Sequence, residues 1–158
     1  MSDSMPKITL EKASKFLIVA RSIALLSKDR NTKVGALAIG PAGEIRAMGY
    51  NGFPRGCNDE LACRHERPEK YLWAEHAERN LIYNAARVGV PLEGCILIVT
   101  PLFPCMDCAR GIVQAGFTSV IAEAENNARW AESNAQAMEL FEEVGIDILK
   151  YQYDRSVK

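Results

Sequence analysis

The feature that most constrains the fold is a regular alternation of helical segments with short apolar runs. Apolar runs at 34–39 and 44–50 flank a Gly-Pro-Ala-Gly turn and predict a hairpin. Later runs at 95–99, 119–122 and 146–149 alternate with helical patterns at 71–88, 105–115 and 130–144. A further helix is expected near the start, with Thr9 as its N-cap. The pattern predicts an α/β fold: a three-layer α/β/α sandwich with a five-stranded, mostly parallel mixed sheet.

Length and composition narrow the class of protein. With 158 residues, 48% of them hydrophobic and 25% charged, the chain suits one globular domain spanning 1–158. A net charge of −1 argues against a broad nucleic-acid-binding surface. No apolar run approaches the ~20 residues that cross a membrane, and the N-terminal MSDSMPK does not resemble a signal peptide. We therefore expect a cytoplasmic protein with no membrane partner.

Two short motifs carry the candidate chemistry. The first is His76-Ala-Glu78, inside the predicted helix 71–88, and the second is Pro-Cys105-Met-Asp-Cys108, at a strand-to-helix turn. Cysteines three positions apart at the start of a helix lie on one face, and the helix dipole favours their thiolate forms. One imidazole and two thiolates suit tetrahedral Zn²⁺, and three protein ligands leave a position open for water. The sequence therefore predicts one catalytic zinc per chain.

Glu78 is the candidate proton carrier beside the metal. Two residues span about 200° around a regular helix, so the side chains of His76 and Glu78 would diverge. The difficulty disappears if the metal lies at the N-terminal end of the helix, where side chains curl over the end from both sides. We therefore predict that His76 lies in or near the first turn and that the regular helix begins later than Tyr71.

Together these motifs match the zinc deaminase pattern H-x-E followed by P-C-x-x-C. The chain resembles the cytidine and deoxycytidylate deaminase superfamily, and within it the deoxycytidylate (dCMP) deaminases. The resemblance runs from about 27 to 150 and includes SKDRNTKVG at 27–35, GYNGFPRGC at 49–57, HAERN at 76–80 and PCMDCA at 104–109. It implies the cytidine deaminase-like fold and hydrolytic deamination at C4 of a cytosine nucleotide, dCMP to dUMP, which supplies pyrimidine nucleotides for dTTP synthesis.

The resemblance also implies roles for individual residues. His76, Cys105 and Cys108 would hold zinc, and Glu78 would be the catalytic acid and base. Substrate contacts are expected from Asn51 through its amide, Gly52 through close backbone approach, Arg55 through the 5′-phosphate, Phe103 through stacking on the base, and Asn80 as a brace. Further phosphate candidates are Arg64, Arg67 and Lys70.

Several alternatives stay open on the sequence alone. The substrate could be another nucleoside, base or modified nucleotide, or an adenosine in tRNA, and a structural zinc or redox domain is the alternative outside enzymes. Cys57, Cys63 and His65 could bind a second, structural zinc, which we do not expect because a fourth ligand is missing nearby. By resemblance, the partners are a nucleotide and further copies of the chain, up to a hexamer, and dCTP and dTTP are candidate regulators.

Overall fold

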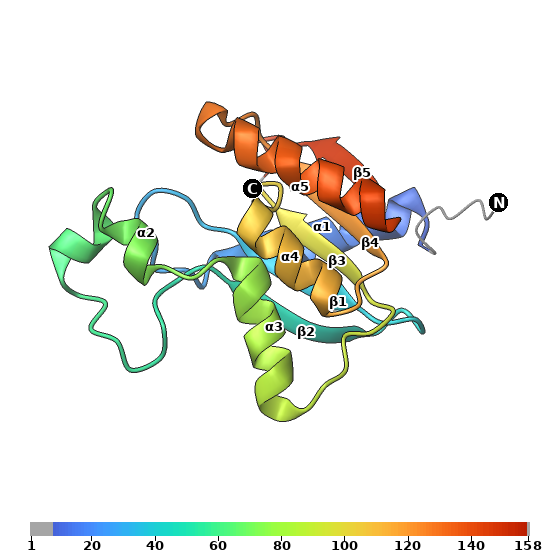
Figure 1. Cartoon of the computed structure of the whole chain (residues 1–158), viewed down its shortest axis with the longest axis horizontal. Helices are drawn as coiled ribbons and strands as arrows, with labels where there is room; N and C mark the ends of the chain where they lie inside the picture. The colour runs from blue at the N-terminus through green and yellow to red at the C-terminus, as the bar shows by residue number, and fades with distance from the viewer. Residues whose placement is uncertain (1–7, 158) are drawn as a thin grey trace.

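The computed structural model describes residues 8–157 (Figure 1). The hairpin and the later alternation of helices and strands follow the predicted order. The elements are α1 (Leu10–Ala24), β1 (Gly35–Ile39), β2 (Ile45–Tyr50), the 3-10 helix η1 (Ala62–His65), α2 (Lys70–Trp73), α3 (Ala77–Val88), β3 (Ile96–Thr100), α4 (Met106–Gln114), β4 (Ser119–Ala124), the 3-10 helix η2 (Ala128–Trp130), α5 (Ala131–Val144) and β5 (Asp147–Gln152).

The five strands form one sheet in the order β2-β1-β3-β4-β5. β1 pairs antiparallel with both β2 and β3, whereas β3, β4 and β5 pair in parallel. Four strands therefore run in one direction and β1 opposes them, which agrees with the predicted mixed, mostly parallel sheet. The carboxyl ends of β3 and β4 lie side by side, and this edge of an α/β sheet is where such folds bind ligands.

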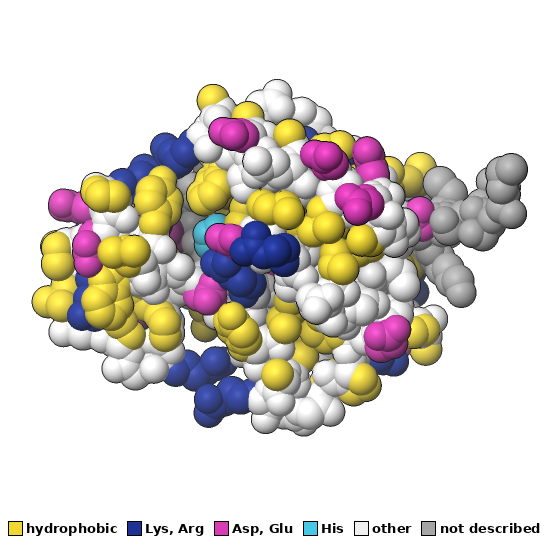
Figure 2. Space-filling model, in the orientation of Figure 1, with side chains coloured by type: hydrophobic (Ala, Val, Ile, Leu, Met, Phe, Trp, Pro, Cys, Tyr) yellow, Lys and Arg dark blue, Asp and Glu magenta, His cyan; other side chains and the backbone are white. Residues whose placement is uncertain are grey.

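Helices cover both faces of the sheet, giving the predicted three layers (Figure 1). α1 packs on one face through Ala13, Leu17 and Ala20. α3, α4 and α5 pack on the other face and form the larger apolar core. Figure 2 shows acidic side chains gathered over α5, whose apolar side faces the sheet. Burial of one stripe of each helix is the main contribution to the stability of this arrangement.

The structure corrects the extent of several predicted elements. Thr9 caps α1 as expected, because its hydroxyl accepts a hydrogen bond from the backbone N–H of Lys12. The predicted helix 71–88 is divided into α2 and α3, and residues 74–76 between them are extended. β4 and β5 continue beyond the predicted limits of 122 and 149. Within residues 8–157 no helix is long and apolar enough to span a bilayer.

Candidate metal centre and active site

His76 lies at the start of α3, as its N-cap residue. Two features of the backbone fix the position of His76. Gly52 and Glu75 exchange backbone hydrogen bonds of 3.0 and 2.7 Å, which tie the segment before α3 to the end of β2. Gly49 lets the helix begin directly on the β2 backbone, since a Cβ at this position would come within 2.4 Å of the carbonyl oxygen of Ala77. The prediction that His76 belongs to the first turn is confirmed.

Cys105 and Cys108 occupy the corresponding place at the start of α4. Cys105 is the N-cap residue and Cys108 lies in the first turn, so both sulfurs face the same direction. The hydroxyl of Ser133 in α5 accepts a hydrogen bond of 2.9 Å from the backbone N–H of Met106 and so satisfies one free donor of this helix end. Both cysteines are buried.

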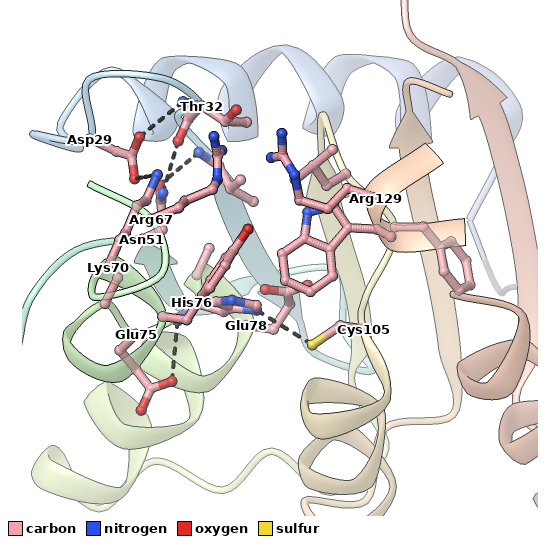
Figure 3. A pocket seen from close by; sticks show the side chains of 17 residues that line it. Asp29, Thr32, Asn51, Arg67, Lys70, Glu75, His76, Glu78, Cys105 and Arg129 are labelled. Carbon is pink, nitrogen blue, oxygen red and sulfur yellow. Dashed lines mark hydrogen bonds and ion pairs between the residues drawn. The ribbon is translucent and has the colours of Figure 1, made fainter. Parts of the chain in front are cut away.

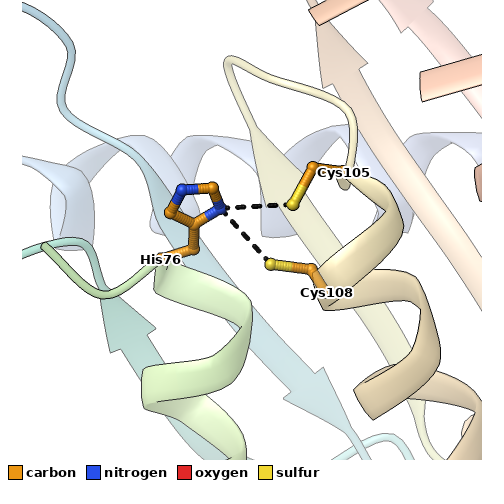
Figure 4. Close-up of side chains that lie close together, drawn as sticks. All are labelled: His76, Cys105 and Cys108. Atoms are coloured by element: carbon orange, nitrogen blue, oxygen red, sulfur yellow. Dashed lines mark hydrogen bonds between the residues drawn. The ribbon is translucent and has the colours of Figure 1, made fainter. Parts of the chain in front are cut away.

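The three predicted ligands converge (Figure 4). The Sγ atoms of Cys105 and Cys108 each lie 3.4 Å from Nδ1 of His76, and all three donor atoms lie within 4.8 Å of one another. The hydrogen bond from Cys108, helped by His76, lowers the pKa of Cys105 to about 4. The same contact raises the pKa of Cys108 well above its ordinary value. A divalent cation bound between them would favour the thiolate form of both cysteines.

The donor set fits a catalytic zinc site. Imidazole and thiolate are ligands that zinc prefers. Among the described residues, no fourth His, Cys, Asp or Glu joins the group. A structural zinc site is normally closed by a fourth protein ligand, so this arrangement is the open, catalytic type.

Glu78 follows His76 in the first turn of α3, and its side chain is buried, with 4% of its surface exposed. The carboxyl group lies beside His76 and Cys105 in the close-up view (Figure 3). Burial raises the pKa of Glu78. The divergence that a regular helix would impose does not arise, because His76 precedes the helix and Glu78 lies inside it. The end of α3 thus presents both side chains to one cavity.

That cavity is the pocket drawn in Figure 3. His76, Cys105 and Glu78 form one side of the pocket. The rest comes from loops and short helices that the sequence places far apart: Asp29, Thr32, Val34, Asn51, Arg67, Lys70, Tyr71, Ala74, Glu75, Ala77, Leu102, Phe103, Arg129 and Trp130. A second depression beside Arg79 and Ser133 also reaches His76, and Figure 2 shows a histidine side chain visible from outside.

Comparison with known proteins identifies this architecture. The family model described as "Cytidine and deoxycytidylate deaminase zinc-binding region" matches residues 10–124. The chain belongs to this family. The predicted resemblance is thereby confirmed, as is the assignment of His76, Cys105 and Cys108 to zinc. The alternative of a structural zinc or redox domain without catalysis is wrong, since the chain is a deaminase, a hydrolase with a His/Cys/Cys zinc site.

Individual relatives of this deaminase span nearly its whole length. The deoxycytidylate deaminase of Homo sapiens is 35% identical over 90% of this chain and 80% of its own length. An uncharacterized deaminase of Aliivibrio fischeri, from the luxG 3′ region, is 37% identical over 86% of this chain and 90% of its own. The crystal structure of dCMP deaminase from the cyanophage S-TIM5 in complex with dCMP and dUMP is 27% identical, with a TM-score of 0.74, over 90% of this chain and 98% of that one.

The structure brings only two of the predicted substrate residues to the pocket. Phe103 lines it and is otherwise buried, with its ring packed edge-on against Phe141 at 6.1 Å. Asn51 lines it as well, but both ends of its amide are engaged. Its Oδ1 accepts from the backbone N–H of Val34 at 2.8 Å, and its Nδ2 donates to the carbonyl of Thr32 at 2.9 Å. The side chain of Asn51 therefore shapes the 32–34 segment of the pocket wall.

The other three predicted substrate residues line neighbouring depressions instead. Arg55 donates to Oδ1 of Asn84 at 2.5 Å, on the outer side of α3. Gly52 is used for the backbone bridge to Glu75, and a Cβ there would meet nothing within 4 Å. Asn80 braces β2, as its amide donates to the carbonyl of Tyr50 at 2.9 Å. The pairing of Arg55 with a phosphate in this pocket is not what the geometry favours, because proximity in sequence to Asn51 does not fix where its long side chain points.

Among the further cations, the structure selects differently from the sequence. Arg64 stacks 3.6 Å over the ring of Trp73, outside the pocket. Lys70 lines the pocket but forms a 2.6 Å ion pair with Asp29. Arg67 lines the pocket, and so does Arg129, which sequence reasoning missed. The one sequence signal for Arg129 is its position in the turn between β4 and α5.

Trp130 and Tyr71 are the other residues that were missed. Trp130 lines the pocket with its ring edge-on to His76 at 5.6 Å. Tyr71 packs edge-on against Trp130 at 6.2 Å. These rings form an aromatic wall next to the metal ligands. An aromatic residue at a helix start carries no sequence signal for this role.

The candidate residues for a second zinc lie apart from the metal centre. Nε2 of His65 lies 2.6 Å from the carbonyl oxygen of Asp59, and its ring packs against Phe53. The sulfur of Cys57 accepts from Arg64 at 3.1 Å, and Cys63 is exposed. Within residues 8–157 these side chains are not gathered into a group of three metal donors.

Proposed function

We propose that this deaminase converts dCMP to dUMP and ammonia, and so supplies pyrimidine nucleotides for dTTP synthesis. The observation that carries the proposal is the construction of the pocket, which joins a zinc site and a buried carboxylate to two arginines that have no ion-pair partner among residues 8–157. Relatives named deoxycytidylate deaminase, and a structural neighbour whose complex holds dCMP and dUMP, support the same substrate.

The phosphate end of the pocket is formed by Arg67 and Arg129. In the described part of the chain, neither guanidinium has a hydrogen bond or an ion pair, and in Figure 3 both lie at the opposite end of the pocket from His76 and Cys105. A guanidinium suits a phosphate because its planar fork of donors can form two parallel hydrogen bonds. The 5′-phosphate of the nucleotide would bind here. Lys70 adds positive charge but is already neutralised by Asp29.

The base would lie at the metal end, between the aromatic side chains. Trp130 stands edge-on to His76, and Phe103 forms another part of the same wall. Flat aromatic surfaces favour a planar heterocycle and exclude water from it. The pocket therefore orients the cytosine ring with C4 toward the metal and the sugar toward the arginines.

The reaction replaces the 4-amino group of cytosine by oxygen from water. His76, Cys105 and Cys108 would hold zinc, which when bound would lower the pKa of a water molecule and so make hydroxide available at neutral pH. Glu78 accepts one proton from the attacking water and delivers it to N3 of the ring. It then transfers the second proton to the amino group, which leaves as ammonia. The burial of Glu78 keeps this proton transfer away from bulk solvent.

Ammonia release by the zinc-loaded enzyme tests the proposal directly. The panel contains dCMP, CMP, dCTP, deoxycytidine, cytosine and tRNA, at equal concentrations. We expect the highest kcat/KM for dCMP, with deoxycytidine weaker because it lacks the phosphate. Preference for deoxycytidine or cytosine over dCMP would contradict the phosphate site at Arg67 and Arg129. Preference for tRNA would favour the adenosine deaminase alternative, which the net charge of −1 argues against.

Assembly into an oligomer, up to a hexamer, and a cytoplasmic location stay predictions.

A further inference from the structure

Glu123 is a buried carboxylate that the proposed chemistry does not use. It lies near the end of β4 with 5% of its surface exposed. Nε of Arg21 in α1 donates to its Oε2 at 2.8 Å, and a second guanidinium nitrogen donates to Oε1. A buried ion pair is a weak source of stability compared with apolar residues of the same volume. The burial of the pair between Glu123 and Arg21 therefore suggests that Glu123 has a role other than stabilising the core.

Glu123 contacts the strand that leads to the metal site. The hydroxyl of Thr100, the last residue of β3, donates to Oε2 of Glu123 at 3.3 Å, and Thr100 is 1% exposed. The two residues are neighbours across the parallel pair, one position beyond the registered pair Val99 and Ala122. They face the α1 side of the sheet. The pocket and the carboxylate of Glu123 thus lie on opposite faces of the sheet, at the ends of β3 and β4.

The loop after Thr100 carries pocket and metal residues. Leu102 and Phe103 line the pocket, and Cys105 follows as the N-cap of α4. Within the described chain, two interactions join β4 to the start of this loop. One is the hydrogen bond to Glu123, and the other runs from the backbone N–H of Glu125 to the carbonyl of Pro101 at 2.7 Å. The first residues of the loop that leads to Cys105 are therefore tied to the end of β4 and to the residue that follows it.

The C-terminal tail covers both acidic residues. Arg21 also donates to the carbonyl of Val157 at 3.2 Å, and its guanidinium lies over the ring of Tyr153 at 5.3 Å. Arg155 donates to Oε2 of Glu125 at 2.5 Å. Residues 153–157 thus contact Arg21 and Glu125 on the side of the sheet away from the pocket. A contiguous chain of contacts runs from the tail through Glu123 and Thr100 to the metal loop.

We propose that Glu123 is a positioning residue for the zinc site: with Arg21 and the tail, it fixes Thr100 and so the loop that delivers Cys105 and Phe103. Its charge matters because a carboxylate binds the arginine and accepts from Thr100 at the same time, whereas an amide does so weakly. Loosening this contact lets the loop sample positions in which the Sγ atom of Cys105 is displaced. Zinc then leaves faster, although every ligand is still present.

Zinc transfer to a chelator tests this role without any substrate. Thr100→Val and Glu123→Gln are compared with Ile121→Val, which removes one methyl group from the same strand and the same face but touches neither Thr100 nor the loop. Zinc-loaded proteins are mixed with excess chelator under conditions in which all remain folded by circular dichroism. We expect Thr100→Val and Glu123→Gln to release zinc about threefold to tenfold faster than the unchanged protein. Ile121→Val should release it at the unchanged rate, despite a similar loss of stability toward urea.

The tail provides a milder test if Glu123→Gln does not fold. A chain ending at Gln152 lacks Tyr153, Arg155 and Val157 but retains Arg21, Glu123 and Thr100. We expect faster zinc release in this truncated chain, in the same direction and smaller than for Thr100→Val. If Thr100→Val and the truncated chain lose stability but release zinc at the unchanged rate, the network only stabilises the fold and the proposal is overturned.

Kinetics with dCMP add a second readout that rests on the proposed function. Because Phe103 belongs to the same loop, we expect Thr100→Val to raise KM for dCMP while the zinc-saturated enzyme keeps most of its kcat. Failure of the chain to use dCMP would remove this arm alone. The zinc-release result would still decide whether Glu123 positions the metal loop.

Discussion

The two ends of the pocket are built in different ways. The metal end consists of side chains at two helix starts, His76 and Glu78 in α3 and Cys105 and Cys108 in α4, each pair within three residues of sequence. The proposed phosphate end consists of residues from loops and short helices that long-range contacts bring together, such as the ion pair between Asp29 and Lys70. The difference teaches that local spacing encodes the chemistry of this deaminase, whereas tertiary contacts encode its substrate.

Removing a metal ligand should have the largest effect. We expect Cys105→Ala to lose bound zinc and to reduce deamination by about 10⁴-fold or more, because both the metal's charge stabilisation and its supply of hydroxide are lost. Metal analysis and ammonia release measure the two effects. Cys63→Ala is the matched control, since this exposed cysteine lies outside the metal group, and it should retain one zinc and full activity. A change in zinc content for Cys63→Ala would revive the second zinc site.

Changing the proton carrier should separate chemistry from metal binding at the same end. Glu78→Gln preserves the shape of the side chain but cannot move protons, so kcat should fall by about 10²- to 10⁴-fold. Zinc content should stay at one per chain. Turnover close to that of the unchanged enzyme would exclude Glu78 as the acid and base, and loss of zinc along with activity would show that it supports the metal instead.

The phosphate end should affect binding rather than chemistry. Arg67→Ala and Arg129→Ala should each raise KM for dCMP by about 10- to 100-fold. This factor corresponds to the binding free energy of one hydrogen bond to a charged group. Neither change should alter KM for deoxycytidine, which has no phosphate. Arg55→Ala is the control, because Arg55 contacts Asn84 outside the pocket. An effect of Arg55→Ala as large as that of Arg67→Ala would restore the sequence-based assignment of the phosphate site.

The smallest effect on turnover is expected from the ion pair that holds the loops of the phosphate end. Hydrogen bonds from Lys70, Thr32 and Asn31 outweigh burial and lower the pKa of Asp29 below its ordinary 3.8. The pair therefore stabilises the fold fully above that pH, and its contribution is lost as the pH falls through the lower folded pKa. At neutral pH Asp29→Asn should reduce the free energy of unfolding by about 1–2 kcal/mol, measured by urea denaturation.

The pH dependence of that difference gives the sign of the effect. At a pH below its lowered folded pKa, Asp29 of the unchanged protein becomes protonated and resembles the amide, so the two free energies of unfolding should converge. A difference that persists or grows in acid would mean that Asp29 acts through its shape and hydrogen bonds to the 31–32 turn rather than through its charge.

Sequence reasoning succeeded where a short spacing carries the geometry. The divergence of His76 and Glu78 on a regular helix predicted that His76 lies in or near the first turn and that the helix begins later than Tyr71, and the structure begins the helix at Ala77. It did not anticipate that Arg55 contacts Asn84 outside the pocket, because a long side chain after a strand has many directions available and this contact is decided by the packing of α3 against β2. Arg129 was missed for a related reason, since η2 reaches the pocket only after β4 and α5 are in place.

What the sequence by itself determined is the layered α/β fold, the zinc triad and the helix ends that present it. Hydrophobic periodicity and the i to i+3 spacing of cysteines are local quantities, readable without knowing what packs where. Only the tertiary structure decided which cations face the pocket, which glycines allow close packing, and how Thr100 is held by Glu123. These features depend on side chains that come together from distant segments of the chain. The direction of each side chain is set by many tertiary contacts rather than by the spacing of residues in the sequence.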